Sequence, residues 1–198
     1  MQEKKRGRAH SRWLLPAALV LAGAAWFENF TLSTSTVTAA SAALPEAFSG
    51  LRIVQISDLH GRRFDAESRY LLELVRLQSP DLIALTGDLA DEFTDFSMLP
   101  PLLDGLTALA PTFYVTGNHE WVLSREKREA LFSMLDAAGV VRLQNEYRLL
   151  QKGQASIVLA GVDDPNGPYD QKRPAQLVRE IRQSRGRDAH IIMISYSN

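Results

Sequence analysis

Gly50-Leu-Arg-Ile-Val-Gln-Ile-Ser-Asp-Leu-His60 is the stretch from which the fold of this chain can be worked out. Leu51, Ile53 and Ile56 are apolar, and a short apolar run of this kind bounded by turn residues predicts a β-strand. The strand is expected over Leu51–Ser57. It runs directly into a polar turn, which carries a carboxylate and an imidazole two residues apart.

Two further apolar runs end in the same way. Strands are expected at Asp81–Thr86 and Thr112–Thr116, and they run into Gly87-Asp88-Leu-Ala-Asp91 and Gly117-Asn118-His119-Glu120. Ligands of open α/β sheets gather at the carboxyl ends of the strands. Asp-x-His and Gly-Asp alone are common in ordinary turns, and Gly-Asn-His-Glu is less so. All three in order at three strand ends indicate one shared site.

Amphipathic stretches separate these strands and predict an α/β fold with a layered sheet. Helices are expected at Ala66–Gln78, Phe96–Leu109, Ser124–Ala138 and Arg173–Ser184. Further strands are expected at Val140–Leu143, Tyr147–Gln151, Ser156–Gly161 and His190–Ser195. Ser124 is a candidate N-cap, and Gly139 is expected to end its helix.

The composition excludes several classes of protein. The 198 residues have a formal net charge of -1 and no cysteine. A strongly basic nucleic-acid binder is not expected, and sites built on cysteine are excluded. The sequence also lacks the Gly-x-Ser-x-Gly turn of many serine hydrolases and the glycine-rich loops that bind nucleotides. Asp, His and Asn instead suit manganese, iron or zinc, and a carboxylate such as Asp88 can bridge two such ions.

The N-terminal part differs in composition from the rest. Residues 1–12 form a basic tail, residues 13–32 an anchor or signal segment, residues 33–44 a linker or edge strand, and residues 45–198 the folded domain. Trp13–Phe27 has no charged residue, and cations before an apolar run are typical of signal peptides and membrane anchors. A membrane anchor helix is favoured over a cleaved signal and over a buried helix. Such an anchor would place the domain on the outer side of the bacterial inner membrane.

The order Asp58-x-His60, Gly87-Asp88-x-x-Asp91 and Gly117-Asn118-His119-Glu120 resembles the first three blocks of calcineurin-like metallophosphoesterases. Leu44-Pro45 and Ala160-Gly-Val-Asp-Asp-Pro165 are similar to the membrane-associated bacterial branch of that family. The resemblance implies a β-sandwich flanked by helices and a dimetal centre that hydrolyses phosphoesters through a bridging hydroxide. It implies metal ligation by Asp58, His60, Asp88 and Asn118.

The same resemblance assigns roles to the neighbouring residues. His119 would stabilise the transition state or protonate the leaving oxygen, and Glu120 would orient its imidazole. Asp91 would support a ligand without binding metal. Asp163 and Asp164 would face the substrate or form a solvated turn. The substrate would be a phosphorylated small molecule or a lipid, including a lipid-linked pyrophosphate, and no nucleic-acid partner is expected.

The sequence departs from the family pattern after His190–Ser195. The family has a ligand histidine directly after this strand, followed later by Gly-His-x-His; Tyr196 stands at the first position, and the second motif is absent. His190 lies six residues before Tyr196, about 20 Å away along a strand. These departures predict weak metal binding, low activity and a domain incomplete at its C-terminus. The alternative is an inactive anchored remnant or a binding module of the same fold.

Overall fold

The computed structural model describes residues 14, 16, 32, 34–65, 67–167 and 171–196. It divides into two compact units, residues 1–37 and 38–198, and the fold described below lies within the second. The expected anchor segment falls outside the described residues except at Leu14, Pro16 and Leu32. Among the helices of the described residues, none has the length and apolar character needed to cross a bilayer.

The first sheet has four parallel strands in the order β1-β2-β3-β4. The strands are β1 (Ile53–Ile56), β2 (Leu82–Thr86), β3 (Thr112–Val115) and β4 (Val141–Arg142). Every residue of β2 and β3 is buried, as expected of parallel strands covered on both faces. Since all four strands run the same way, their carboxyl ends meet at one edge of the sheet.

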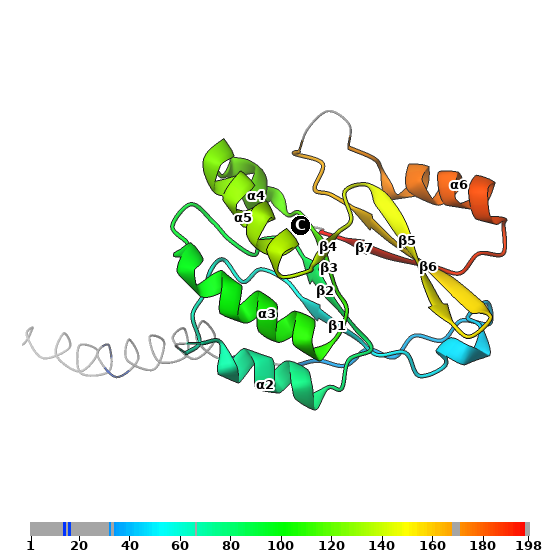
Figure 1. Cartoon of the computed structure of the whole chain (residues 1–198), viewed down its shortest axis with the longest axis horizontal. Helices are drawn as coiled ribbons and strands as arrows, with labels where there is room; N and C mark the ends of the chain where they lie inside the picture. The colour runs from blue at the N-terminus through cyan, green and yellow to red at the C-terminus, as the bar shows by residue number, and fades with distance from the viewer. Residues whose placement is uncertain are drawn as a thin grey trace, which may run out of the picture. The chain divides into compact units, whose positions relative to one another are not determined.

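Helices connect these strands and lie together on one side of the sheet (Figure 1). They are α2 (Arg69–Leu77), α3 (Leu99–Leu109) and α5 (Arg125–Ala137). Two prolines occupy the first turn of α3, where a missing N–H has no cost to the helix. The Ser124 side chain accepts a hydrogen bond from the backbone N–H of Lys127, so Ser124 caps α5 as expected.

The second sheet has three strands in the order β5-β6-β7. β5 (Glu146–Lys152) and β6 (Ala155–Val162) form an antiparallel hairpin, and β7 (Ile191–Ser195) pairs parallel to β6. The helix α6 (Pro174–Arg185) provides the crossover between β6 and β7. β6 therefore runs between two partners, and its last six residues are buried.

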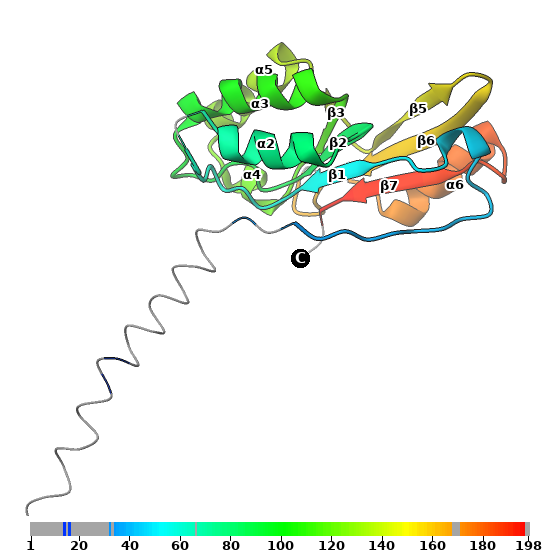
Figure 2. The same cartoon turned by 90° about the horizontal axis from the view of Figure 1, so that it is seen from below.

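The two sheets pack against each other, with helices on their outer faces (Figure 2). One core cluster joins residues of β2 and β3 to residues of β6 and β7: Leu82, Ala84, Phe113, Val115, Leu143, Leu159 and Ile194. A second cluster joins the other face of β6 to α6: Val158, Ala160, Val162, Leu177 and Ile181. The order of layers is helices, parallel sheet, mixed sheet and helix, which confirms the expected α/β sandwich flanked by helices.

Local details differ from the sequence-based expectations. Phe96–Met98 forms a separate 3₁₀ turn, η2, before α3, and Glu46–Phe48 forms another, η1. A five-residue helix, α4 (Asn118–Val122), begins directly after β3 and was not expected. Helices this short leave little periodic pattern in a sequence. Residues 34–41 adopt no helix or strand.

Candidate metal centre

The turns that follow β1 and β2 have an unusual backbone conformation. Asp58, His60 and Asp88 all have positive φ, at 57°, 46° and 52°. L-residues rarely adopt this left-handed conformation, although Asp does so more readily than most. Backbone strain of this kind persists where the surrounding structure fixes it, and it clusters at functional sites. Here it redirects three potential metal ligands over the end of the sheet.

Two glycines allow the turns after β2 and β3 to approach each other. A Cβ atom on Gly87 would lie 2.6 Å from the backbone of Gly117, and a Cβ on Gly117 would clash with Oδ1 of Asp88. Gly87 also has a φ of +81°. No side chain fits at either position, so the Gly-Asp and Gly-Asn motifs are explained by close packing of two backbones as well as by their polar residues.

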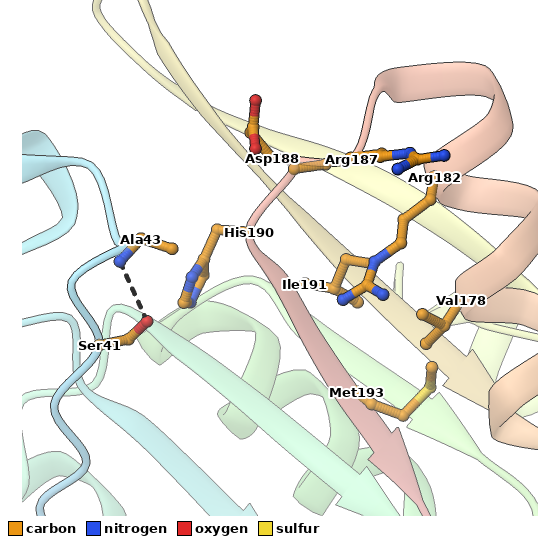
Figure 3. Close-up of a pocket in the computed structure, with 10 residues that line it drawn as sticks. Ser41, Ala43, Val178, Arg182, Arg187, Asp188, His190, Ile191 and Met193 are labelled. Carbon is orange, nitrogen blue, oxygen red and sulfur yellow. Dashed lines mark hydrogen bonds between the residues drawn. The ribbon is translucent and has the colours of Figure 1, made fainter.

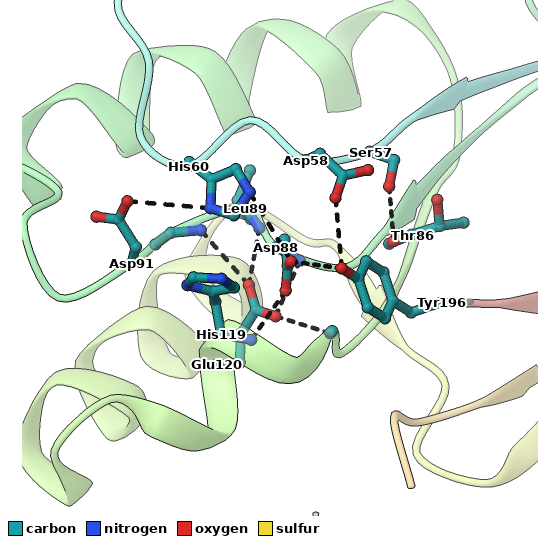
Figure 4. A network of polar contacts seen from close by, with 12 residues as sticks. Ser57, Asp58, His60, Thr86, Asp88, Leu89, Asp91, His119, Glu120 and Tyr196 are labelled. Atoms are coloured by element: carbon teal, nitrogen blue, oxygen red, sulfur yellow. Dashed lines mark hydrogen bonds and ion pairs between the residues drawn. The ribbon is translucent and has the colours of Figure 1, made fainter. Parts of the chain in front are cut away.

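Three side chains from the three turns meet at this edge (Figure 4). His60, Asp88 and His119 each offer a potential ligand atom, and these atoms lie within 4.8 Å of one another. The rings of His60 and His119 meet edge to face, with centroids 4.6 Å apart. Nitrogen and carboxylate oxygen together suit a borderline divalent ion, so the donor set fits a metal of this kind.

Asp88 is at the centre of the cluster and is almost completely buried, with 1% of its surface exposed. Its Oδ1 accepts a hydrogen bond from the backbone N–H of His119 at 2.9 Å. Its Oδ2 lies 3.9 Å from Nε2 of His60 and accepts a 2.7 Å hydrogen bond from the Tyr196 hydroxyl. One oxygen therefore fixes the turn, and the other points at the neighbouring side chains.

Tyr196 extends the cluster to Asp58. The Tyr196 hydroxyl lies 3.5 Å from Oδ1 of Asp58, whose side chain comes from the turn after β1. Desolvation raises the pKa of the Tyr196 hydroxyl above its ordinary value, and hydrogen bonding to Asp88 adds to this effect. The strand β7 places this residue, because Tyr196 directly follows its last residue, Ser195.

Asp91 lies on the opposite side of His60. Its Oδ2 is 3.9 Å from Nδ1 of His60, while its Oδ1 accepts hydrogen bonds from the Phe93 backbone and the Thr94 hydroxyl. The imidazole of His60 thus lies between two carboxylates, Asp88 and Asp91. A carboxylate beside the second ring nitrogen of a histidine ligand orients the ring and raises its basicity.

Glu120 is fully buried and holds the two turns together. Its carboxylate accepts hydrogen bonds from the backbone N–H groups of Asp88, Leu89 and Gly117, at 3.0, 2.8 and 2.7 Å, and a longer one from Ala90. Burial raises the pKa of the Glu120 carboxyl, and the Gly117 and Asp88 amides offset part of this rise. These contacts support a role of Glu120 in positioning Asp88, and its orientation of the His119 imidazole stays a prediction.

Asn118 and the Asp163–Asp164 pair lie at neighbouring strand ends. Asn118 is the first residue of α4 and is partly buried next to His119. Asp163 Oδ1 accepts a hydrogen bond from the Thr116 backbone N–H at 3.0 Å, and Asp164 Oδ1 accepts one from the Asn166 backbone N–H at 2.8 Å. Both aspartates are buried, so they do not form the solvated turn that was one alternative.

A separate hollow lies at the other end of β7 (Figure 3). Its lining includes Ser41 and Ala43 from the segment before η1, Arg182 from α6, and Arg187 and His190. The arginines give this hollow the wrong charge for a metal ion. His190 lies here, at the opposite end of the strand from Tyr196, as the spacing along the strand predicted.

Comparisons with known proteins agree with this architecture. The chain is 33% identical over 117 residues to the uncharacterized metallophosphoesterase YkoQ of Bacillus subtilis, covering 58% of this chain and 43% of that protein. It is 33% identical over 118 residues to the phosphodiesterase YaeI of Escherichia coli, covering 57% of this chain and 43% of that protein.

A third relative is a transmembrane protein with a metallophosphoesterase domain from Danio rerio. It is 30% identical over 132 residues, covering 61% of this chain and 29% of that protein. The matched part spans less than half the length of each of these three relatives. The family model for calcineurin-like phosphoesterases matches residues 51–193, which include the turns at Asp58, Asp88 and Asn118. This match covers most of the chain, and the protein therefore belongs to the calcineurin-like phosphoesterase family.

Proposed function

We propose that this chain is a metal-dependent hydrolase of phosphoester bonds. The observation that carries the proposal is the position of Asp88, whose buried carboxylate directs one oxygen toward His60 while Oδ1 is held by the His119 backbone. A buried charge directed at other potential ligands, rather than at a compensating cation of the protein, favours a bound metal ion.

The residues at the carboxyl edge of the parallel sheet have two proposed roles, metal binding and proton transfer. Asp58, His60, Asp88 and Asn118 would hold two divalent ions, which we propose to be manganese, iron or zinc. When bound, such ions polarise phosphoryl oxygens and lower the pKa of bound water. The His119 imidazole, packed against His60, would give a proton to the leaving oxygen or stabilise charge on the phosphoryl group.

The substrate and the location are parts of the same proposal. We propose that the substrate is a phosphomonoester, a phosphodiester or a lipid-linked pyrophosphate. We also propose that the apolar segment Trp13–Phe27 holds the domain at a membrane, where it meets this substrate. The basic residues before this segment favour a location of the domain on the outer side of the bacterial inner membrane. The Danio rerio relative is named as a transmembrane protein, which is consistent with a membrane setting for this chain.

The test is hydrolysis of bis(4-nitrophenyl) phosphate and 4-nitrophenyl phosphate by the whole chain, with and without Mn²⁺. We expect slow hydrolysis that requires Mn²⁺, because only His60 and His119 bring imidazoles to the cluster in the described part of the chain. Asp88→Asn should reduce the rate to background, since an amide is a much weaker ligand and cannot bridge two ions.

Asp81→Asn is the matched control. Asp81 precedes the same strand that Asp88 follows, and its Oδ2 accepts a hydrogen bond from the exposed Arg52 backbone N–H. It should retain the rate of the unmodified chain. Equal and metal-independent background rates for the unmodified chain and for Asp88→Asn would overturn the proposal and favour an inactive remnant or a binding module.

A further inference from the structure

We propose that Tyr196 competes with the divalent cation for Asp88 and Asp58, and so sets the metal affinity of the site. This inference rests on the proposed function, because it concerns the same ligands. The evidence is the position of the Tyr196 hydroxyl, which lies 2.7 Å from Oδ2 of Asp88 and 3.5 Å from Oδ1 of Asp58. The hydroxyl therefore lies at the point where two carboxylates from different turns converge.

The two oxygens of Asp88 are not equivalent in this respect. Oδ1 accepts the His119 backbone N–H, a bond that holds the turn and leaves Oδ2 as the oxygen facing the cluster. Tyr196 donates its single hydroxyl hydrogen to this Oδ2. A cation that binds Asp88 through Oδ2 must displace this hydrogen bond, which is a charge-assisted one and stronger than a bond between neutral groups.

The ring of Tyr196 packs against the turn that follows β2. A Cβ atom on Gly87 would lie 2.8 Å from Cδ2 of Tyr196, so the ring lies directly over this glycine. This contact and the 2.7 Å hydrogen bond together place the hydroxyl beside Asp88. A cation that takes this position must displace the hydroxyl.

Tyr196→Phe removes the competing hydroxyl and keeps the ring. The expected result is Mn²⁺ binding about tenfold tighter, which corresponds to about 1.4 kcal/mol and to the lower range for one hydrogen bond to a charged group. Tyr196→His should bind Mn²⁺ more tightly still, because imidazole nitrogen is itself a ligand. Binding can be measured by the loss of the electron paramagnetic resonance signal of free Mn²⁺.

A second readout separates competition from a structural role. Without metal, Tyr196→Phe should melt at a lower temperature, because it loses a hydrogen bond. Saturating Mn²⁺ should then raise its melting temperature more than that of the unmodified chain, since tighter binding stabilises the native state more. A merely structural tyrosine would lower the melting temperature without changing the Mn²⁺-dependent increase. Tyr147→Phe is the matched control, because the Tyr147 hydroxyl bonds Ser184 and Arg185 at a different place.

The outcomes distinguish this inference from the proposed function. If the unmodified chain binds Mn²⁺ and Asp88→Asn does not, the metal site stands; unchanged or weaker binding by Tyr196→Phe then overturns the competition alone. If the unmodified chain, Asp88→Asn and both Tyr196 variants all fail to bind Mn²⁺, the metal site and the competition fall together. Tighter binding by Tyr196→Phe, with Tyr147→Phe unchanged, supports the inference.

Discussion

Asp88 and Asp163 both lie buried just beyond the end of a strand, yet their surroundings differ. Asp88 follows β2 of the parallel sheet, and its Oδ2 faces Tyr196 and His60. Asp163 follows β6 of the mixed sheet, and its Oδ1 accepts the Thr116 backbone N–H across to the end of β3. The first carboxylate has an oxygen directed at potential ligands, and the second ties two sheets together. An aspartate at a strand end therefore acquires its role from what the fold brings opposite it.

The contacts that hold Asp88 and Asp163 in place differ as well. The turn that carries Asp88 has positive φ, two glycines in contact and the buried Glu120 carboxylate beneath it. The region around Asp163 is fixed by hydrogen bonds to Thr116 and Asn145. The metal edge thus depends on close backbone packing and on a buried charge, which single substitutions should disturb strongly.

The largest effect is expected for Gly87→Ala. The new Cβ would meet the Gly117 backbone at 2.6 Å and would sit on a residue with a φ of +81°, so we expect a loss of about 3 kcal/mol or more in the free energy of unfolding. Urea denaturation measures it. Gly139→Ala is the matched control, with a φ of +78° and no atom within 4 Å, and should lose only about 1–2 kcal/mol. Equal losses in the two variants would mean that the close approach of the turns is unimportant.

A somewhat smaller effect is expected for Glu120→Gln. The amide retains one acceptor oxygen and turns its NH₂ group toward backbone N–H donors, which should lower the free energy of unfolding by about 2–3 kcal/mol. Urea denaturation at several pH values measures the loss.

The pH dependence of this loss has a defined sign. Burial raises the pKa of Glu120 above its ordinary 4.5, so protonation stabilises the native unmodified chain. This stabilisation is complete below pH 4.5 and is lost as the pH rises through the folded-state pKa. The difference between the unmodified chain and Glu120→Gln should therefore widen on acidification toward pH 4.5. A difference that narrows on acidification would contradict the raised pKa.

Asp163→Asn should have a modest effect on stability and none on metal binding. Weakening the hydrogen bond to the Thr116 backbone should cost about 1 kcal/mol of unfolding free energy. The Mn²⁺-dependent increase in melting temperature should stay as in the unmodified chain, whereas Asp88→Asn should abolish it. Loss of the Mn²⁺ response in Asp163→Asn would break the distinction drawn between the two strand ends.

The smallest effect is expected for Asp164→Asn. Its Oδ1 accepts hydrogen bonds from the backbone N–H and from Nδ2 of Asn166, a local turn in which an asparagine side-chain oxygen can accept both. The free energy of unfolding should fall by only about 0.5 kcal/mol, the lower end for a weakened hydrogen bond. A larger loss in thermal or urea denaturation would indicate that the charge of Asp164 has a further partner.

Much of the fold could be predicted because strand and helix patterns differ in period. The buried runs of β2 and β3 and the capped helix α5 lie within a few residues of where the sequence indicated them. The expected strand Val140–Leu143 is paired only at Val141–Arg142, because its length depends on contact with β3 and not on its own residues. The helix α4 was missed, since five residues carry too little periodicity.

The site could be predicted in part, because polar residues that follow apolar strands can be recognised in the sequence. Three polar turns after three apolar strands indicate a shared edge, and Asp58, His60, Asp88 and His119 do lie there. The backbone contacts of Glu120 could not be read from the sequence, because they join residues about thirty positions apart. The contact of Tyr196 with Asp58 spans 138 positions and depends on the packing of one sheet against the other.

The sequence alone determined the order of strands and helices, the family resemblance and the residue types available for chemistry, since these depend on local pattern and motif spacing. Only the tertiary structure decided which oxygen of Asp88 faces the cluster, that Glu120 supports the turns, and that the Tyr196 hydroxyl bonds Asp88. The physical reason is that these contacts depend on distances between different turns and sheets, which packing fixes and which no local pattern records.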